Sequence, residues 1–399
     1  MAAEQRVWLS YVNDYENFEE GVDDADSFSL VIPTTNTIVW VKSLKDIVVG
    51  TSGGEWKIGS NEIDTPLTPS NWSVDEQSNY GSKNIQAIKI NEAVLFVDFV
   101  GRKIRELIYS DADRKYVAPD LTSLAEHITY SGITSLAYQK NPDSILWVTL
   151  DDGSLRIMPY DREQDVVAWA KVPIGGTSVE VQSVCVTPAT DEDTVTISVK
   201  RTINEADTIY IEQLASRTFT AIEDCFFVDS GITVENNPAS ATLAGLTHLV
   251  GETVTVLGDG VKYTPTAVVD ADGEVTISTA VEKAQVGLSK DSLLQPMRIV
   301  LGGQDGTSMG SITRVNELVI SFLNTGAAKY GSNEDDLHSV DFTDERWTNS
   351  CEIDGLFSGE VVVSMPGGFS VLNPIIITSD GPMPCTVRAI VARLDQTGR

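Results

Sequence analysis

The sequence predicts an all-β protein made of β-propeller-like blades, followed by a small β-barrel domain and a C-terminal β-rich region. Short runs rich in β-branched and aromatic residues, such as TIVWVKS, AVLFVDFV and SILWVTL, are bounded by turn residues. Several of these runs recur at a nearly constant interval. Helical spacing is rare, and residues 121–127 (LTSLAEH) are the one short candidate.

The blades are indicated by the recurring first strand of each module. These strands start at Ile38, Ile85, Ile133 and Val181, so successive modules lie 47 or 48 residues apart. Each start is followed by a second apolar strand (IVVG, VLFV, ILWV, TVTI) and then by a turn and a third strand. A unit of four short antiparallel strands that repeats every 40 to 50 residues or so is typical of a propeller blade. We therefore expect about four blades in residues 31–216.

A glycine corner joins the second and third strands of the first module, in DIVVGTSGGEWKIGS (46–60). Gly53 and Gly54 occupy the place that Gly101 and Gly153 take in the next two modules. A phosphate-binding loop would be followed by a helix, whereas a strand follows here. We expect glycine at this corner because a tight hairpin requires a positive φ.

The N-terminal region, residues 1–30, contains the strand-like run QRVWLSYV (5–12), with no inner strand before it. A lone outer strand would leave its backbone donors and acceptors unpaired. We expect it to close a ring by pairing with a later segment, or to belong to an incomplete blade.

The rhythm changes after the modules. Residues 217–290 contain LAGLTHLVGETVTVLGDG and VDADGEVTIS, which predict short strands joined by Gly-Asp turns in a small β-barrel domain. Residues 291–399 contain LVISFLN, EVVVSM, NPIIITS and CTVRAIVARL, which predict a sandwich or final, irregular blades. Between LVISFLN and EVVVSM, the acidic loop GSNEDDLHSVDFTDERW (331–347) is expected to be exposed.

The charge limits the partners. The chain has 28 Lys and Arg and 58 Asp and Glu, with a formal net charge of −30. Such a surface repels nucleic acid and anionic membranes at long range, which disfavours a DNA- or RNA-gripping module. No leader and no apolar run long enough for a bilayer is evident, so we expect a protein that is not inserted in a membrane. The four cysteines, which we expect to be reduced and buried, are Cys185, Cys225, Cys351 and Cys385.

The sequence predicts no catalytic, cofactor-binding or metal-binding residue, and we expect no enzyme. The three histidines, His127, His248 and His338, do not have zinc-ligand spacing. His248 is expected to be hydrogen-bonded locally within the small barrel. A Ser-His-Asp triad has no G-x-S-x-G elbow to support it, and the many acids neither support nor exclude a glycosidase pair.

Two short motifs have more ordinary interpretations than ligand binding. Asp270, Asp272 and Glu274 could suggest calcium, but the twelfth position of such a loop is Val281, so a D-G hairpin turn is favoured. Residues 302–311 (GGQDGTSMGS) lack the GKS or GKT ending of a phosphate loop, which favours a flexible loop.

Several stretches together resemble one protein family. They include QRVWLSYVNDYENFEEG, LKDIVVGTSGGEWKIG, VGRKIRELIY, YVAPDLTSLAEHI, GLTHLVGETVTVLGDG, RIVLGGQDGTSMG and PMPCTVRAIVARL. The chain is similar to the tail hub or nozzle proteins of short-tailed bacteriophages, also called packaged-DNA stabilisation proteins. The barrel resembles the small FCCH-like domain named after ubiquitin-activating enzymes, without implying ubiquitin chemistry.

The resemblance implies a structural virion protein of the phage tail, assembled in the host bacterial cytoplasm. It implies a homo-oligomeric ring, hexameric by the family pattern, below the portal and adaptor. Double-stranded DNA would pass through its channel during ejection without specific binding. Members of the family usually have a longer region before the RVWLS strand, and that region is the part expected to dock on the adaptor. An acidic wall would keep the duplex centred and mobile.

Two alternatives come from other classes of protein. A host-surface-binding tail component could use the acidic loop 331–347 and exposed aromatic residues to recognise a glycan. A propeller glycoside hydrolase could trim capsule polysaccharide. The first is the stronger of the two, although the tandem shaft repeats of trimeric fibres are not evident in the sequence.

Overall fold

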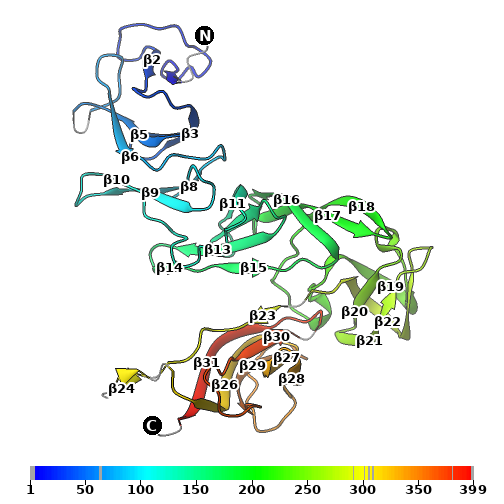
Figure 1. The fold of residues 1–399 in the computed structure, drawn as a ribbon. Coiled ribbons are helices and arrows are strands. Elements are labelled where there is room, and N and C mark those ends of the chain that lie inside the picture. Colours follow the sequence, from blue (N-terminus) through cyan, green and yellow to red (C-terminus); the bar gives the residue numbers. More distant parts are fainter. Residues whose placement is uncertain are drawn as a thin grey trace. The chain divides into compact units, whose positions relative to one another are not determined.

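The fold consists of antiparallel β-sheets, as Figure 1 shows. The structure is a computed structural model that describes residues 5–62, 65–290, 292–300, 302–303, 306–307, 310–379 and 381–396. Within these residues the only helices are two short 3-10 turns, η1 (Ile222–Asp224) and η2 (Thr247–Leu249). The predicted all-β class is confirmed.

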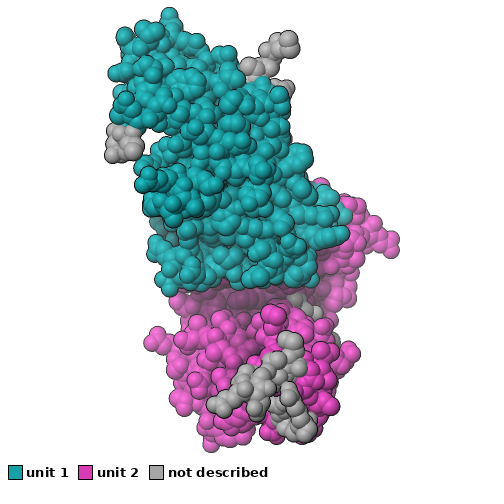
Figure 2. All heavy atoms as spheres, turned by 60° about the vertical axis from the view of Figure 1, so that its left-hand side comes forward, with its two compact units in different colours: residues 1–172, 180–199, 211–214 teal, residues 173–179, 200–210, 215–399 magenta. Residues whose placement is uncertain are grey.

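The chain divides into two compact units (Figure 2). Unit 1 comprises residues 1–172, 180–199 and 211–214, and unit 2 comprises residues 173–179, 200–210 and 215–399. The strands of both units form antiparallel sheets, and each unit has its own apolar cores.

Unit 1 begins with a two-stranded sheet, β1 (Arg6–Leu9) and β2 (Phe28–Val31). The N-terminal strand therefore pairs with the next strand of the chain, and its pairing closes no ring. One face of this sheet, with Val7, Leu9 and Leu30, packs on Val49 and Ile58 of the following sheet. This packing explains why the short N-terminal strand is held in place.

Three antiparallel meanders follow, and they are the first three predicted modules. The first has the order β3 (Ile38–Ser43), β4 (Ile47–Thr51), β5 (Gly54–Gly59), β6 (Ser73–Ser78). The second has the order β7 (Ile88–Ile90), β8 (Ala93–Val97), β9 (Ile104–Ser110), β10 (Lys115–Val117). The third contains β11 (Ile133–Gln139), β12 (Ile145–Leu150) and β13 (Leu155–Asp161), with β14 (Val166–Val167) and β15 (Ala170–Val172) both paired to β13.

The fourth module is a three-stranded meander of longer strands, β16 (Thr177–Thr187), β17 (Thr194–Ile203) and β18 (Ala206–Gln213). Its strands contribute residues to both units. The sequence period is thus confirmed as a repeated meander. The strand pairings among the described residues close neither a propeller ring nor a barrel.

The modules of unit 1 pack face to face, and β8 shows how the sequence achieves this. All five of its residues are buried, so neither face meets water. Val94 and Phe96 belong to the core shared with the first meander, while Leu95 and Val97 belong to the core shared with the third. Successive side chains of a strand point to opposite faces, so a continuous apolar run can serve two cores.

A backbone hydrogen bond also links each corner to the next module. The carbonyls of Thr51, Gly101 and Gly153 accept hydrogen bonds from the amides of Ser82, Ile133 and Val181, at 2.8, 2.8 and 2.7 Å. The donors lie just before or within the first strand of the following module. The repeat is therefore a repeat of contacts between modules as well as of strands.

The glycine corners have two different causes. Gly101 and Gly153 have positive φ, of 86° and 74°, as predicted. Gly53 and Gly54 do not have positive φ, and that prediction is wrong for them. A Cβ on Gly54 would lie 2.7 Å from the carbonyl oxygen of Ser78, so close approach of the backbone excludes a side chain there.

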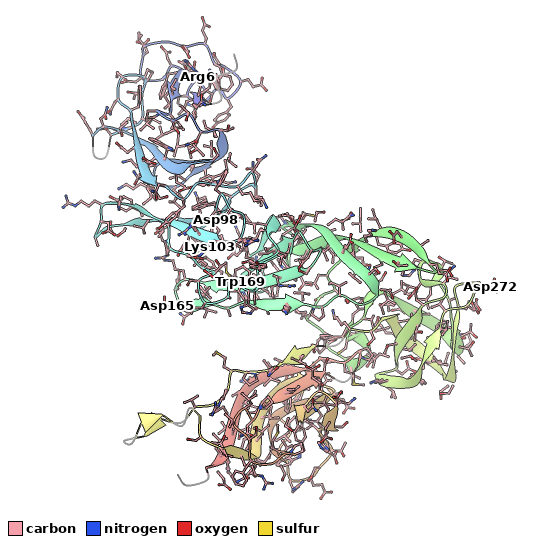
Figure 3. All side chains as sticks on the ribbon, viewed as in Figure 1. Arg6, Asp98, Lys103, Asp165, Trp169 and Asp272 are labelled. Carbon is pink, nitrogen blue, oxygen red and sulfur yellow. The ribbon has the colours of Figure 1, made fainter. Side chains whose placement is uncertain are left out.

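The β8–β9 corner shows how a polar side chain organises such a turn. The carboxylate of Asp98 accepts hydrogen bonds from the backbone amides of Gly101, Arg102 and Lys103, at 3.0 to 3.1 Å. Figure 3 labels Asp98 and Lys103 at this corner. The Nζ of Lys103 lies 2.9 Å from Asp120 and 2.8 Å from Glu126, and these acceptors raise the pKa of Lys103. The ion pairs attach the loop after β10 to the corner.

The helix candidate at 121–127 forms a series of turns instead. The carboxylate of Asp120 accepts hydrogen bonds from both the amide and the hydroxyl of Thr122, which favours a turn over a helix. Leu124 is 99% exposed, so the segment presents no continuous apolar face that a helix would bury.

Unit 2 contains a four-stranded sheet with the order β19 (Asp229–Leu243), β22 (Val275–Leu288), β20 (Thr253–Gly258), β21 (Val261–Val268). Its core includes Leu246, which precedes η2, and Leu249, the last residue of η2, together with Val256 and Val286. The predicted strands of the small domain are present at the positions that the sequence indicated. Ladder closure into a barrel is not found among the described pairings.

The C-terminal part of unit 2 has two sheets that share one core. One has the order β29 (Phe357–Ser364), β26 (Thr313–Thr325), β31 (Thr386–Gln396), and the other has the order β23 (Leu293–Leu294), β30 (Ile376–Ser379), β27 (Ala328–Asn333), β28 (Asp336–Ser339). Ile320, Phe322 and Ile377 are among the core residues that both sheets supply. A separate hairpin pairs β24 (Gly302–Gly303) with β25 (Gly306–Thr307).

The acidic loop 331–347 is less exposed than predicted. It includes β28, and Val340, Phe342 and Trp347 pack against the C-terminal core. Phe342 stacks on Phe357 with ring centroids 5.0 Å apart. The acidic residues Glu334, Asp335, Asp336, Asp341 and Glu345 are exposed, so the prediction holds for them and fails for the apolar residues that pack on the core.

Candidate functional site

The three histidines lie in separate environments. His127 is exposed in the loop after β10. His248 has its Nε2 2.7 Å from the carbonyl oxygen of Ser230, and its own carbonyl accepts a hydrogen bond from Tyr210. The predicted local hydrogen bonding of His248 is thus confirmed. His338 lies 3.6 Å from Asp336 on the surface of β28. No group of three or more His, Cys, Asp or Glu that could hold a metal occurs among the described residues.

The acidic motif at 270–274 forms a turn. The carboxylate of Asp270 accepts hydrogen bonds from the amides of Asp272 and Glu274, at 3.0 and 2.9 Å, and Gly273 has a positive φ of 76°. The favoured turn interpretation is confirmed in this respect. The turn connects β21 to β22, which are not adjacent strands in the sheet, so it is not the turn of a hairpin.

Of residues 302–311, Gln304, Asp305, Ser308 and Met309 lie outside the described residues. The described part contains the short pairing of β24 with β25. The prediction of a flexible loop at this position therefore stays a prediction.

The cysteines are free thiols in the described part of the chain, and their burial differs. Cys225 is fully buried and its pKa is raised to about 12, chiefly by burial. Burial also raises the pKa of Cys385 to about 11. Cys185 is exposed on β16, and Cys351 and Cys385 are partly buried, so the prediction of buried thiols is confirmed for Cys225, holds in part for Cys351 and Cys385, and is wrong for Cys185.

Buried charges form the most unusual polar feature of unit 1. Glu55 is fully buried, and its carboxylate accepts hydrogen bonds from the hydroxyls of Ser78 and Ser82, at 2.5 and 3.0 Å. Burial raises the pKa of Glu55, which the hydrogen bonds and the charge of Arg105 only partly offset. The guanidinium of Arg105 lies 3.4 Å from the ring centroid of Tyr80. These contacts connect the first and second meanders.

Glu106 makes the corresponding connection to the third meander. Its carboxylate accepts a hydrogen bond of 2.7 Å from Tyr160 and is paired with Arg162. Burial raises the pKa of Tyr160, so the phenol keeps its proton and acts as a donor. The geometry has the character of a structural link, since both acids use their oxygens to hold the neighbouring module.

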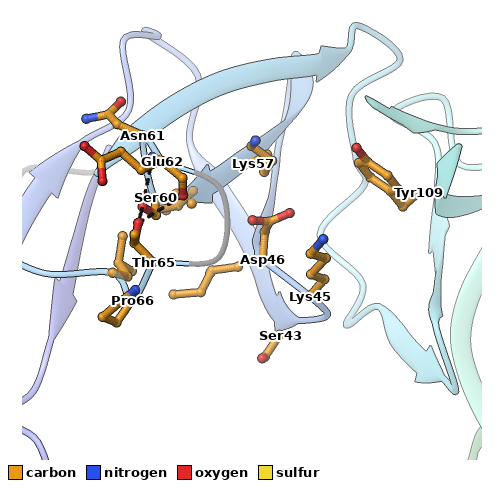
Figure 4. Close-up of a pocket in the computed structure, with 14 residues that line it drawn as sticks. Ser43, Lys45, Asp46, Lys57, Ser60, Asn61, Glu62, Thr65, Pro66 and Tyr109 are labelled. Carbon is orange, nitrogen blue, oxygen red and sulfur yellow. Dashed lines mark hydrogen bonds between the residues drawn. The ribbon is translucent and has the colours of Figure 1, made fainter. Parts of the chain in front are cut away.

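A polar hollow of about 500 Å³ lies in unit 1 (Figure 4). The β3–β4 turn supplies Lys45 and Asp46, and β5 and the loop after it supply Lys57, Ser60 and Thr65. The hydroxyls of Ser60 and Thr65 are 2.5 Å apart, and both accept hydrogen bonds from Asn71. The polar groups of this wall therefore form most of their hydrogen bonds with one another.

A second hollow, of about 440 Å³, shares Lys45 and Tyr109 with the first. Tyr116 lines it and donates a hydrogen bond of 3.2 Å to the carboxylate of Asp46. Burial raises the pKa of Tyr116 to about 12, so this phenol stays protonated at neutral pH and does not act as a base. The two hollows offer charges of both signs to a polar group from solvent, and the geometry shows no chemistry beyond that.

Sequence reasoning missed the buried charges and the hollows. The sequence does contain a signal for these charged residues, because Glu55, Arg105 and Arg156 are each the second residue of the third strand in their module. Aligning the modules by their corners brings Glu55 of the first module and Arg105 of the second, which have opposite charges, to equivalent positions. The hollows had no such signal, since their walls come from turns that the repeat does not describe.

No protein-family model matches the chain, and no curated protein shows significant similarity to it. The described residues contain no helix that is long and apolar enough to cross a membrane.

Proposed function

We propose that this chain is a structural subunit of a bacteriophage tail, a hub or nozzle that assembles into a ring-shaped conduit. The ring retains packaged DNA and lets it pass during ejection. The proposal rests on the resemblance of the sequence stretches to that family, and the repeated antiparallel meanders, which close no ring among the described residues, support it at the level of an all-β modular scaffold. The observation that supports it most is the face-to-face packing of these meanders through two-sided apolar strands such as β8.

The polar features of unit 1 support a scaffold over a catalyst. Glu55 and Glu106 use their carboxylates to connect neighbouring meanders. The net charge of −30 disfavours tight binding of a duplex, as a conduit requires. Cations within the Debye length of about 8 to 10 Å would screen the remaining repulsion.

The test is imaging of the purified chain by negative-stain electron microscopy, together with mass photometry. The expected result is a ring whose bore admits duplex DNA, about 20 Å across. Binding of a random-sequence duplex is expected to be weak at physiological salt. A protein that stays monomeric at all concentrations, or that binds duplex DNA tightly, would contradict the proposal.

A further inference from the structure

The loop between β1 and β2, residues 10–27, is a folded surface feature of unit 1. The amide of Tyr11 donates to the carbonyl of Asn17 at 2.9 Å, and that of Val12 donates to Ala25 at 3.0 Å. The hydroxyl of Ser27 donates to the carbonyl of Glu19 at 2.5 Å. These bonds close the loop on itself, so its side chains project from a defined backbone.

Large apolar and acidic side chains share the surface of this loop. Tyr15 and Val22 are 81% and 87% exposed, and Val12 and Phe18 are more than half exposed. Six acids are exposed beside them, namely Asp14, Glu16, Glu19, Glu20, Asp23 and Asp24. The sequence contains no Lys, Arg or His between Arg6 and Lys42. We call this surface the acidic ridge. Exposed apolar groups gathered in this way indicate a protein contact.

A surface of the opposite kind lies in the C-terminal part of unit 2. Backbone hydrogen bonds of 3.0 and 2.9 Å join Thr313 to Ser370, and a guanidinium nitrogen of Arg298 lies 3.5 Å from the carbonyl of Ser311. Three segments are thereby brought together. Their exposed apolar side chains are Met297, Ile299, Ile312, Phe369, Val371 and Leu372. We call this surface the C-terminal patch.

The C-terminal patch also differs from the rest of the chain in charge. Residues 292–300, 310–316 and 361–379 contain Arg298 and Arg314 and no Asp or Glu, in a chain with 58 acids, although Asp395 of β31 lies opposite Arg314 in the ladder. Two copies with a net charge of −30 repel each other over most of their surfaces. The C-terminal patch is a place where an acidic surface of another copy meets apolar groups and cations.

We propose that the acidic ridge of one copy docks on the C-terminal patch of a second copy. The inference rests on the proposed ring and goes further by naming its two contacting faces. Because the two faces are different, the contact is head-to-tail, and its repetition leads to a closed ring or an open filament. Tyr15 and Phe18 are the apolar anchors, and Arg298 and Arg314 select the acidic partner.

The test uses two charge-reversal variants of the full chain. A ridge variant carries Glu16→Lys, Glu19→Lys and Asp24→Lys, whose side chains make no hydrogen bond that holds the loop in the structure described. A patch variant carries Arg298→Glu and Arg314→Glu. Each variant alone should self-associate about tenfold more weakly than the wild type, or worse, because like charges then face each other. Mass photometry and sedimentation velocity measure this.

Mixing the variants supplies the decisive result. The ridge variant keeps a native patch and the patch variant keeps a native ridge, and the two reversed faces again carry opposite charges, so the mixture should recover the self-association that each variant alone loses. A matched control, with Glu334→Lys, Asp335→Lys and Glu345→Lys on exposed acids of the loop 331–347, has the same charge change and should assemble as the wild type does. Circular dichroism of every variant checks the fold.

The outcomes separate this inference from the proposed function. If both variants assemble as the wild type does, the ring stands and the named faces are wrong. If the control weakens assembly as much as the ridge variant, net charge is the cause and the docking proposal is overturned. If the wild type is monomeric at every concentration, both the docking and the proposed conduit fail. A double variant that carries both Tyr15→Ser and Phe18→Ser should weaken assembly at high salt as well, because it removes apolar contact area that salt does not screen.

Discussion

The two-sided packing of β8 predicts which residues of unit 1 are energetically coupled. Phe96 and Leu95 are neighbours in the chain, and both are fully buried. Phe96 lies in one core with Trp40, with ring centroids 5.6 Å apart, whereas Leu95 lies in the other core. Phe96 should therefore be coupled to Trp40, which is distant in sequence, and not to the residue beside it.

The expected magnitudes follow from burial. Truncation of Phe96 to Ala should destabilise unit 1 by about 3–5 kcal/mol, and truncation of Leu95 by about 2–5 kcal/mol. In a double-mutant cycle, the coupling of Phe96 with Trp40 should be about 0.5–1.5 kcal/mol. The coupling of Phe96 with Leu95 should stay below about 0.5 kcal/mol, as for side chains that share no partner.

Urea unfolding followed by tryptophan fluorescence is the suitable assay, because six of the seven tryptophans lie in unit 1 and only Trp347 lies in unit 2. Far-UV circular dichroism of each variant provides an independent signal. If the alanine variants do not fold, the milder set Phe96→Leu, Leu95→Val and Trp40→Phe keeps the cycle measurable. A coupling of Phe96 with Leu95 as large as that with Trp40 would refute the division of β8 between two cores.

Three further predictions concern single residues. Gly54→Ala should destabilise unit 1 by about 1–3 kcal/mol because its Cβ would meet the backbone of Ser78, and urea unfolding that shows no loss would contradict the crowding. Burial raises the pKa of Glu55, so its ionisation destabilises the fold as the pH rises from the unfolded value, about 4.3, through the folded one. Glu55→Gln should gain stability relative to the wild type over that window and keep a constant difference above it; a difference that does not change with pH in urea titrations argues against this. A thiol reagent should modify Cys185 in the folded protein and Cys225 only after unfolding, which mass spectrometry of the labelled peptides decides.

Much of the fold was accessible from the sequence because the modules repeat. Strands at Ile38 and Ile133 begin where the period places them, and the β26 and β31 strands cover the runs LVISFLN and CTVRAIVARL. The segment 121–127 misled because Leu121, Leu124 and Ala125 have helix-like spacing while Asp120 caps a turn instead. Local hydrogen bonding of a carboxylate overrode a weak periodicity.

The acidic ridge and the C-terminal patch were harder to predict from the sequence. The sequence shows that residues 7–41 contain no cation, but it does not show that Tyr15 and Phe18 face solvent among the acids. The C-terminal patch includes Thr313 and Ser370, which are more than 50 residues apart in the chain and are brought together by backbone hydrogen bonds. A property of a surface depends on which segments are neighbours, and composition does not record this.

The sequence by itself determined the all-β class and the meander period, because β-branched runs and turn residues act over a few neighbouring positions. The tertiary structure decided that Leu95 and Phe96 serve different cores, that Gly54 is fixed by the carbonyl of Ser78, and that Glu55 is buried between meanders. These outcomes depend on contacts between residues far apart in the chain, whose free energy arises only when the modules pack together.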